Sequence, residues 1–199
     1  MGRVSQAQAQ ENRRRVVETA SRLFREQGTH VSVADLMKAA GLTHGGFYKQ
    51  FASKEALVDE ATAYAFAETA DRRTEAVPGD QRALIETYLS VEHRDDMADG
   101  CPVAALVTDM ARGADDSAAR RVYSEGVAAF AAALATGDPE NTDDTDGTDG
   151  TDGTDGTDGT DGMTRLCTLV GALVLARATA GSPVSEEILG AARTALTTS

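Results

Sequence analysis

The stretch SVADLMKAAGLTHGGFYKQF, which runs from Ser32 to Phe51, decides the fold of this chain. Ser32 with Asp35 three residues later is a capping pattern that starts a helix. Apolar residues then recur at helical spacing as far as Gly41, which can turn the chain left-handed at little cost. Thr43 can cap a second helix that runs toward Phe51. The stretch therefore predicts two short helices joined by a tight turn.

The second of these helices has two unlike faces. Phe47 and Phe51 fall on one side, whereas the other side is largely polar and opens with Gly45 and Gly46. A glycine inside a helix costs about 1 kcal/mol relative to alanine. Close approach of the helix start to another backbone, such as a phosphate chain, is a physical reason to keep it. Spacing alone leaves two interpretations open: a helix-turn-helix that enters the DNA major groove, and an ordinary helical hairpin.

The flanking sequence favours the first interpretation. An amphipathic helix is predicted over residues 13–27, ending at Gly28, and Ser53 can cap a further helix. Residues 18–60, ETASRLFREQGTHVSVADLMKAAGLTHGGFYKQFASKEALVDE, resemble the TetR family of bacterial transcriptional regulators. Two later segments, GCPVAALVTDMAR (residues 100–112) and LVGALVLARA (residues 169–178), resemble the ligand-binding and dimerisation domain of one TetR subgroup with a GCPVAAL-type motif.

The resemblance implies an all-α fold with two domains. An N-terminal three-helix helix-turn-helix DNA-binding domain is expected over residues 10–56, with its motif at 32–51, behind a flexible basic arm at 1–9. A C-terminal helical ligand-binding and dimerisation domain is expected over residues 57–199. A helix that starts after Lys54 would connect the two, and a ligand in the body could tilt it.

The resemblance also assigns residues to DNA. Thr43, His44 and Gly45 would lead the recognition helix, with His44 the best candidate for a base edge, and an idle surface histidine as the alternative. Tyr48 and Lys49 are expected on phosphate or at the groove wall. The DNA-facing positions are Ser32, Thr43, His44, Gly45, Gly46, Tyr48, Lys49 and Lys54. Arg13, Arg14 and Arg15 are either phosphate contacts or a solvated face.

Charge supports this division of the chain. Residues 1–54 hold nine basic and four acidic residues, a net charge of +5, whereas residues 55–199 hold ten and twenty-eight, a net charge of −18. The basic part would attract phosphate and the acidic part would repel it. The longest apolar run is too short to span a bilayer, and we do not expect the first ten residues to act as a signal peptide, because they have no apolar core. We expect a cytoplasmic protein that contacts no membrane, with no cofactor, no metal site and no catalytic residue.

Between the recognised segments, the sequence predicts turns at 77–80 and helices with apolar stripes. Cys101 and Pro102 start one helix, residues 91–100 are expected to be irregular, and Ser185 is expected to cap the last helix. Six Thr-Asp-Gly triplets fill residues 145–162. Without apolar residues, an acidic flexible loop over 138–162 is the simplest interpretation, and weak cation binding or masking of the basic region are alternatives. The tract would take the place of the first turn of the family's dimer helix.

The most apolar segment, residues 163–180, allows two interpretations. Its stripe of Leu166, Leu169, Val170, Leu173 and Val174 fits either half of a helix–helix dimer interface or a helix buried within one subunit. We favour the dimer interface, joined by Ile188, Leu189, Ala192 and Leu196 of the last helix.

These predictions combine into a functional hypothesis. The chain is expected to be a homodimeric repressor that binds a near-palindromic operator and is released by a small-molecule effector, with no enzymatic activity. The effector-binding residues are unknown, since Tyr88, Met97, Met110, Tyr123 and Phe130 could line a pocket or form plain core. The alternative is an effector-binding protein, or a redox sensor based on Cys101 at a helix start, whose DNA-binding region is vestigial.

Overall fold

Only helices and connecting turns are present in the residues that the computed structural model describes, 6–75, 81–135 and 157–198. The predicted all-α fold is thus confirmed. The helices are α1 (Gln6–Gln27), α2 (Val33–Ala39), the 3₁₀ helix η1 (His44–Lys49), α3 (Lys54–Glu75), α4 (Gln81–Tyr88), α5 (Val91–Asp95), α6 (Pro102–Arg112), α7 (Ala118–Leu134), α8 (Thr157–Ala178) and α9 (Pro183–Thr197).

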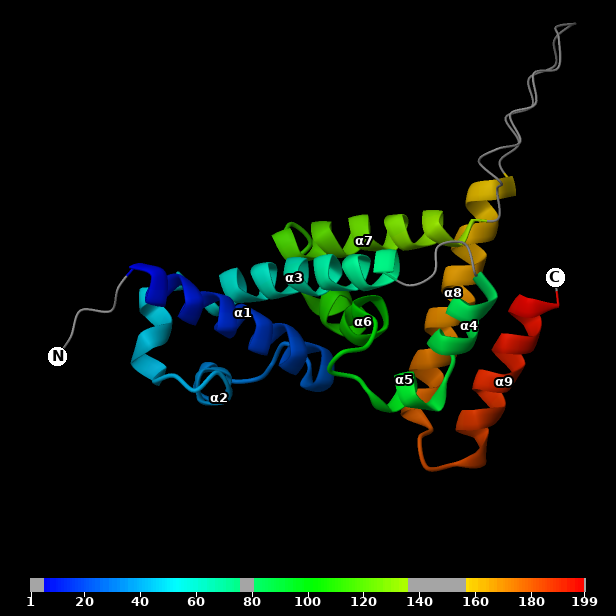
Figure 1. Ribbon diagram of the computed structural model, residues 1–199, viewed down its shortest axis with the longest axis horizontal. Helices are drawn as coiled ribbons and strands as arrows, with labels where there is room; N and C mark the ends of the chain where they lie inside the picture. The colour runs from blue at the N-terminus through cyan, green and yellow to red at the C-terminus, as the bar shows by residue number, and fades with distance from the viewer. Residues whose placement is uncertain (1–5, 76–80, 136–156, 199) are drawn as a thin grey trace, which may run out of the picture.

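The molecule is elongated, with its two ends built from different parts of the chain (Figure 1). Helices α1, α2 and η1, which we call the head (residues 6–53), lie at one end. The antiparallel pair α8 and α9 lies at the other end. The long helices α3 and α7 run side by side between them, with α6 packed beneath. We call the described residues from 54 onward the body.

Two clusters of buried side chains hold this arrangement together. The first joins α1, α2, η1 and the start of α3, and it takes in Leu106 and Met110 of α6 and Ala119 of α7. The second joins α4, α6, α7, α8 and α9 around Leu89, Leu169 and other fully buried residues. Because α6 belongs to both clusters, the head does not have a core of its own.

Several predicted boundaries differ from the structure. Helix α1 begins at Gln6, within the segment expected to be a flexible arm. Residues 91–95 form the short helix α5, which the sequence reading missed because it is charged and has no apolar stripe; Ser90 caps it by accepting a hydrogen bond from the His93 amide at 3.1 Å.

The last helix begins earlier than predicted. Ser182, not Ser185, is its N-cap, and Pro183 occupies the first position. Ser185 is instead fully buried, where its hydroxyl donates to the Ala176 carbonyl at 2.7 Å and accepts from Arg94 at 2.9 Å. The serine therefore ties α9 to α8 and α5.

Helix α8 also begins earlier, at Thr157, so the last two Thr-Asp-Gly triplets are helical. The triplets at 145–156, and with them most of the predicted acidic loop, lie outside the described residues. Gly162 lies so close to α7 that an added Cβ would stand 2.2 Å from the Ala131 carbonyl oxygen. Close packing against α7, which no local pattern reveals, explains why the helix can extend into this tract.

The apolar stripe predicted to form a dimer interface is used within the chain. Leu166, Leu169 and Leu173 are buried against α7 and α9, and Leu189 of α9 is buried with them. Val170, Val174, Ile188, Ala192 and Leu196 are partly buried in the same cluster. The three leucines therefore belong to the core of one subunit, and a dimer interface that involves α8 stays a prediction.

None of the described helices combines the length and the hydropathy needed to cross a membrane.

Candidate nucleic-acid interface

The first helix of the decisive stretch starts as predicted. Ser32 has an extended backbone, and its hydroxyl oxygen accepts a hydrogen bond from the Asp35 amide at 3.1 Å. The hydroxyl proton is donated to the Asp35 carboxylate at 2.6 Å. To donate to a DNA phosphate, Ser32 would have to exchange that bond.

The turn after α2 is set by Gly41, whose φ of +70° is a conformation that favours glycine. Its amide donates to the Lys38 carbonyl at 3.0 Å, and the Leu42 amide donates to the Met37 carbonyl at 2.8 Å. This pair of bonds is the Schellman motif, which satisfies the last carbonyls of a helix and reverses the chain. The turn is therefore fixed by main-chain geometry.

The second helix, predicted to run toward Phe51, is a 3₁₀ helix that ends at Lys49. The Gly46 amide donates to the Thr43 carbonyl at 2.9 Å, an i to i+3 bond, and the Thr43 side chain makes no capping hydrogen bond. Two consecutive glycines weaken an α-helix, and a segment of six residues is of a length that 3₁₀ geometry commonly serves.

The two faces of η1 are separated as predicted. Phe47 is fully buried, and its ring stacks on Phe51 with centroids 5.4 Å apart. On the other face Tyr48 is 67% exposed, and its ring is nearly perpendicular to the His44 ring, with the two centroids 6.1 Å apart. The buried rings of Phe47 and Phe51 thus support the exposed polar surface of η1 from within the head.

The glycines of η1 differ from each other. A Cβ on Gly45 would meet no atom within 4 Å, whereas one on Gly46 would lie 3.5 Å from the Met37 methyl group. None of the described residues therefore requires glycine at position 45.

The start of α3 completes the candidate surface. The Ser53 hydroxyl accepts from the Ala56 amide at 3.1 Å, so the predicted cap is present, and Lys54 is the first residue of the helix. The predicted DNA-facing residues lie in three places along the chain: the start of α2, η1 with Thr43, and the start of α3. Thr43, His44, Gly45, Tyr48 and Lys49 are exposed, as is Ser32, while Gly46 and Lys54 are half-buried.

The three consecutive arginines of α1 differ in their contacts. Arg13 forms a two-bond ion pair with Glu60 of α3, one bond at 2.5 Å, and its guanidinium lies 4.6 Å from the centroid of the Phe51 ring. Arg14 pairs with acidic residues of its own helix. Arg15 donates to the Asn12 side-chain oxygen at 2.8 Å. Arg13 therefore links α1 to α3, and a phosphate contact by Arg15 stays a prediction.

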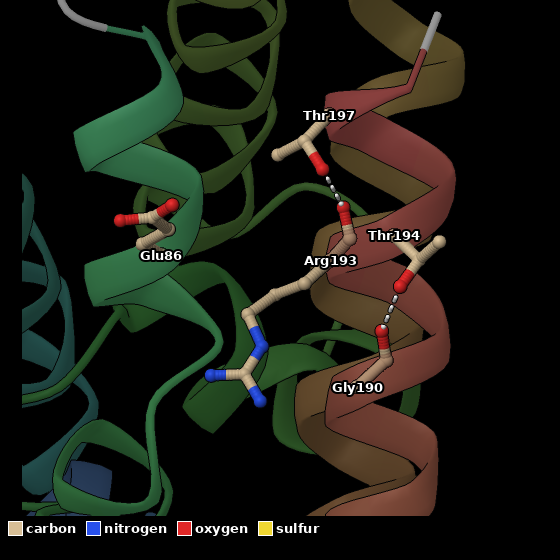
Figure 2. A pocket seen from close by; sticks show the side chains of 5 residues that line it. All are labelled: Glu86, Gly190, Arg193, Thr194 and Thr197. Carbon is tan, nitrogen blue, oxygen red and sulfur yellow. Dashed lines mark hydrogen bonds between the residues drawn. The ribbon is translucent and has the colours of Figure 1, made fainter.

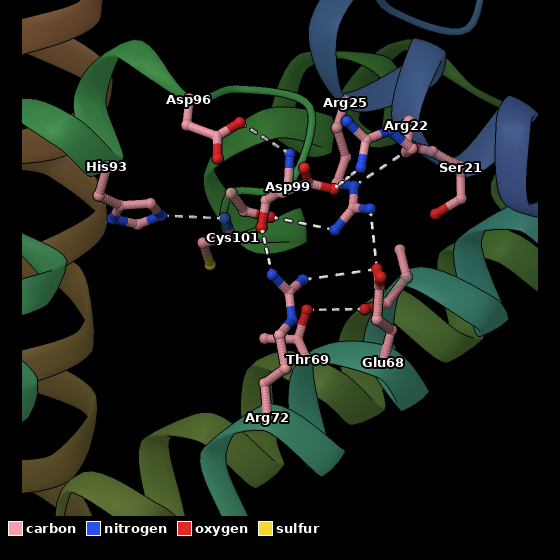
Figure 3. Close-up of polar contacts among 12 residues, drawn as sticks. Ser21, Arg22, Arg25, Glu68, Thr69, Arg72, His93, Asp96, Asp99 and Cys101 are labelled. Atoms are coloured by element: carbon pink, nitrogen blue, oxygen red, sulfur yellow. Dashed lines mark hydrogen bonds and ion pairs between the residues drawn. The ribbon is translucent and has the colours of Figure 1, made fainter. Parts of the chain in front are cut away.

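A second polar cluster joins the head to the body, and sequence reasoning missed it (Figure 3). Arg25 of α1, whose side chain is fully buried, pairs with Glu68 of α3 at 2.9 Å and donates to the Gly100 carbonyl at 3.3 Å. Arg72 of α3 donates to the Asp99 carbonyl at 2.9 Å, and Arg22 pairs with the Asp99 carboxylate. One signal was available: Arg25 lies one turn after the buried Ser21, on the apolar stripe of α1.

The chain around Asp99 and Gly100, which we call the Gly100 turn, is also hydrogen-bonded by His93 of α5. The Nδ1 atom of His93 lies 2.7 Å from the Tyr88 carbonyl, and its Nε2 atom accepts from the Cys101 amide at 3.1 Å. This arrangement requires the neutral ring with its proton on Nδ1. Burial, and secondarily the nearby Arg177 and Arg72, lowers the pKa of His93 below its ordinary value, although the Tyr88 bond and Asp96 act in the opposite direction.

The hollows of the body do not identify an effector site. A cleft of about 420 Å³ between α4 and α9 is lined by Glu86, Gly190, Arg193, Thr194 and Thr197 (Figure 2). The Thr194 and Thr197 hydroxyls already donate to the carbonyls of Gly190 and Arg193, at 3.0 and 2.8 Å. Small-molecule pockets are mostly apolar, so this polar cleft is a poor match.

The residues considered for a pocket lie apart from that cleft. Tyr88, Met110 and Phe130 are buried in the two cores, and the Tyr123 hydroxyl donates to the Val103 carbonyl at 2.8 Å. Met97 is exposed and lines a groove between α1, α6 and α8. In the described parts of the chain, no group of three or more His, Cys, Asp or Glu side chains could hold a metal ion.

Comparison with known proteins agrees with this geometry in the head. Residues 16–61 match the family of bacterial regulatory proteins named tetR. The HTH-type transcriptional regulator AcrR of Shigella flexneri is 39% identical over 61 residues, which are 30% of this chain. The matched part spans only 28% of the length of that relative.

Solved structures share the fold along nearly the whole chain. A TetR-family transcriptional regulator from Cytophaga hutchinsonii has a TM-score of 0.70 at 18% identity, covering 99% of this chain and 98% of its own. Reduced NemR of E. coli has a TM-score of 0.68 at 18% identity, with coverages of 94% and 96%. A TetR regulator from Chloroflexus aurantiacus J-10-FL has a TM-score of 0.65 at 23% identity, with coverages of 96% and 95%.

The described residues thus share their fold with these solved structures over nearly the whole chain. The family match itself is confined to residues 16–61, which lie in the head and the first part of α3.

Proposed function

We propose that this chain is a homodimeric transcriptional repressor that binds a near-palindromic DNA operator and is released from it by a small-molecule effector. The observation that carries the proposal is the exposed polar face of η1, with Tyr48 67% exposed above the buried Phe47. A helix that projects such residues from a rigid floor suits the major groove.

The eight DNA-facing residues take separate roles in this proposal. His44 and Thr43 would read base edges at the start of η1, because N-terminal residues of a recognition helix lead into the groove. Tyr48 and Lys49 would contact phosphate or the groove wall. Ser32 and Lys54 would contact phosphate from the starts of α2 and α3. The open space at Gly45, with Gly46 beside it, would admit the DNA backbone closely.

The proposed dimer uses a face of α8 whose residues are exposed or half-buried in the described part of the chain. Exposed or half-buried residues with small or apolar side chains recur along one line of this helix: Thr164, Cys167, Gly171, Leu175 and Ala178. Leu175 is 56% exposed, and a Cβ on Gly171 would meet nothing within 4 Å. A two-fold packing of this face against its copy would bury Leu175 and place two heads for two half-sites.

The GCPVAAL-type subgroup is also proposed, on the role of its glycine. A Cβ on Gly100 would lie 2.6 Å from the Asp96 carbonyl oxygen and 2.7 Å from the Arg177 guanidinium. Only glycine fits there without displacing main chain. Cys101 of the same motif is 5% exposed, and burial argues against the redox-sensing alternative because reactive thiols are partly exposed.

DNA binding by the purified full chain tests the proposal. Duplexes from around its own gene would be titrated with salt and nonspecific competitor. Competitor-resistant binding of one dimer to one near-palindromic site is expected, followed by release with an effector found by screening the same complex. Weak binding that vanishes at moderate salt, with no motif recovered from a random-sequence selection, would instead favour the vestigial-head alternative.

A further inference from the structure

Arg25 is the charged side chain most enclosed by the head–body contact. It has no exposed side-chain surface, and it bonds three separate parts of the chain. Its guanidinium reaches the Ser21 carbonyl in α1 at 3.2 Å, the Glu68 carboxylate in α3 at 2.9 Å and the Gly100 carbonyl before α6 at 3.3 Å.

Such a residue constrains geometry more than it stabilises the fold. Desolvating a guanidinium costs about as much as its ion pair returns, so a buried pair adds little net stability. Breaking one side of it, however, leaves an unpaired buried charge, and the arginine fork accepts only a narrow range of partner positions. Rotation of α1 against α3 and the Gly100 turn would separate these groups.

The Gly100 turn is itself fixed to α8. The Cys101 amide donates to His93 at 3.1 Å, and Arg177 of α8 donates to the carbonyls of His93 and Arg94, both at 3.1 Å. Substituting Gly100 would collide with this packing. Hydrogen bonds therefore connect Arg177 of α8, through His93 and the Cys101 amide, to the turn whose Gly100 carbonyl accepts from Arg25.

We propose that Arg25 is a positioning residue that sets the orientation of the DNA-facing surface relative to α8, and hence the half-site spacing that a dimer accepts. The spacing part rests on the proposed function, whereas the orientation part stands on the single chain.

Arg22 provides a matched control. It is an arginine on the same helix, one turn earlier, and it reaches the same turn through an ion pair with Asp99. Its side chain is 54% exposed, however, and exposed ion pairs contribute little. Arg22→Met and Arg25→Met therefore each remove a guanidinium from the contact between the head and the body. Arg22→Met removes an exposed one, and Arg25→Met removes a buried one.

The orientation is measured first, without DNA. Cysteines for spin labels replace Ala34 on α2 and Glu125 on α7, both exposed, in full-length chain carrying Cys167→Ser; Cys101 is buried. Labelled chain is diluted with unlabelled chain so that distances arise within one subunit. We expect one narrow distance distribution in the parent and in Arg22→Met, and a broadened or shifted one in Arg25→Met. An unchanged distribution in a folded Arg25→Met protein would overturn the proposal.

Should Arg25→Met not fold, Arg25→Lys and Glu68→Gln give the same test, because the first removes the guanidinium fork and the second removes the charge of its carboxylate partner. Both should broaden the distribution, and a parent-like distribution in both would refute the role of Arg25.

Half-site spacing is measured second. Duplexes carry the selected operator with its half-sites moved by single base pairs. We expect the parent to disfavour altered spacing by about tenfold or more, and Arg25→Met to reduce that preference to about threefold or less with single half-site affinity retained. Uniform weakening at every spacing would indicate a merely structural role. If the parent binds no duplex specifically, the proposed function fails, and the distance measurement still decides the role of Arg25.

Discussion

The head and the α8–α9 end of this molecule expose opposite kinds of surface. The head buries its aromatic residues Phe47 and Phe51 and turns His44 and Lys49 outward. Helix α8 buries Leu166, Leu169 and Leu173 within the chain but leaves Leu175 exposed, and Cys167, about two turns earlier, is exposed as well. Each exposed surface suits a different partner: a polar face over a rigid floor suits DNA, and an apolar face with small residues suits another helix.

The largest effect on stability is expected from removing the buried Phe47 ring beneath the exposed face of η1. Phe47→Ala should lower the free energy of unfolding by about 3–5 kcal/mol, because a fully buried ring is lost. Urea unfolding measures it, with Phe130→Ala in the body core as the matched variant. Since α6 belongs to both cores, we expect one transition in both variants, and a separate early transition in Phe47→Ala alone would contradict the shared core.

A charge on the α8 face should break the proposed dimer. Leu175→Glu would desolvate a carboxylate in the interface, and we expect dimer dissociation to rise by about a hundredfold, which corresponds to ~3 kcal/mol. Sedimentation equilibrium measures the constant. Val91→Glu, at an exposed apolar residue of α5, is the control and should leave it unchanged. Equal constants for both variants and the parent would rule out this face as the interface.

Substitutions of His44 and Lys54 should change DNA binding in different ways. His44→Ala should relax discrimination by about 1–3 kcal/mol at one base pair, because a base contact is lost. Lys54→Ala should weaken all sequences alike and reduce the salt slope of log affinity by about one, because a phosphate contact is lost. Binding titrations at several salt concentrations, on parent and single-substituted operators, measure both. Two variants with the same behaviour would refute these roles.

The smallest effect is expected from pH at the Gly100 turn. The pKa of His93 is lowered in the folded protein, chiefly by burial, so the unfolded chain takes up a proton more readily. This contribution to stability is complete above the unfolded value of about 6.5 and is lost as pH falls toward the folded value. Thermal unfolding between pH 8 and 5 measures it. His93→Gln, whose amide keeps one donor and one acceptor, should remove this part of the pH dependence; an unchanged profile would contradict it.

The head could be read from the sequence because its signals are local. The Ser32 and Ser53 caps, the turn at Gly41 and the burial of Phe47 depend on neighbours within a few residues, and the structure has each of them. The 3₁₀ form of η1 was missed because two adjacent glycines can signal close approach or a weak α-helix. Whether the DNA-facing residues bind DNA stays a prediction.

The errors in the body come from contacts distant in sequence. Arg25 and Glu68 are 43 residues apart, and Ser185 is bonded by Arg94 across 91 residues. A stripe of leucines fits a subunit core and a dimer interface equally well, so the side of α8 that faces solvent could not be chosen in advance. Packing decided it.

The contact of Gly162 with α7 bears on how this gene can vary. All six triplets have the same sequence, so gain or loss of one unit leaves Thr-Asp-Gly immediately before Met163. The residue pressed against Ala131 is then always glycine, whatever the number of repeats. A different number of triplets would therefore change the length of the chain between α7 and α8 and still place glycine at the position that packs against α7.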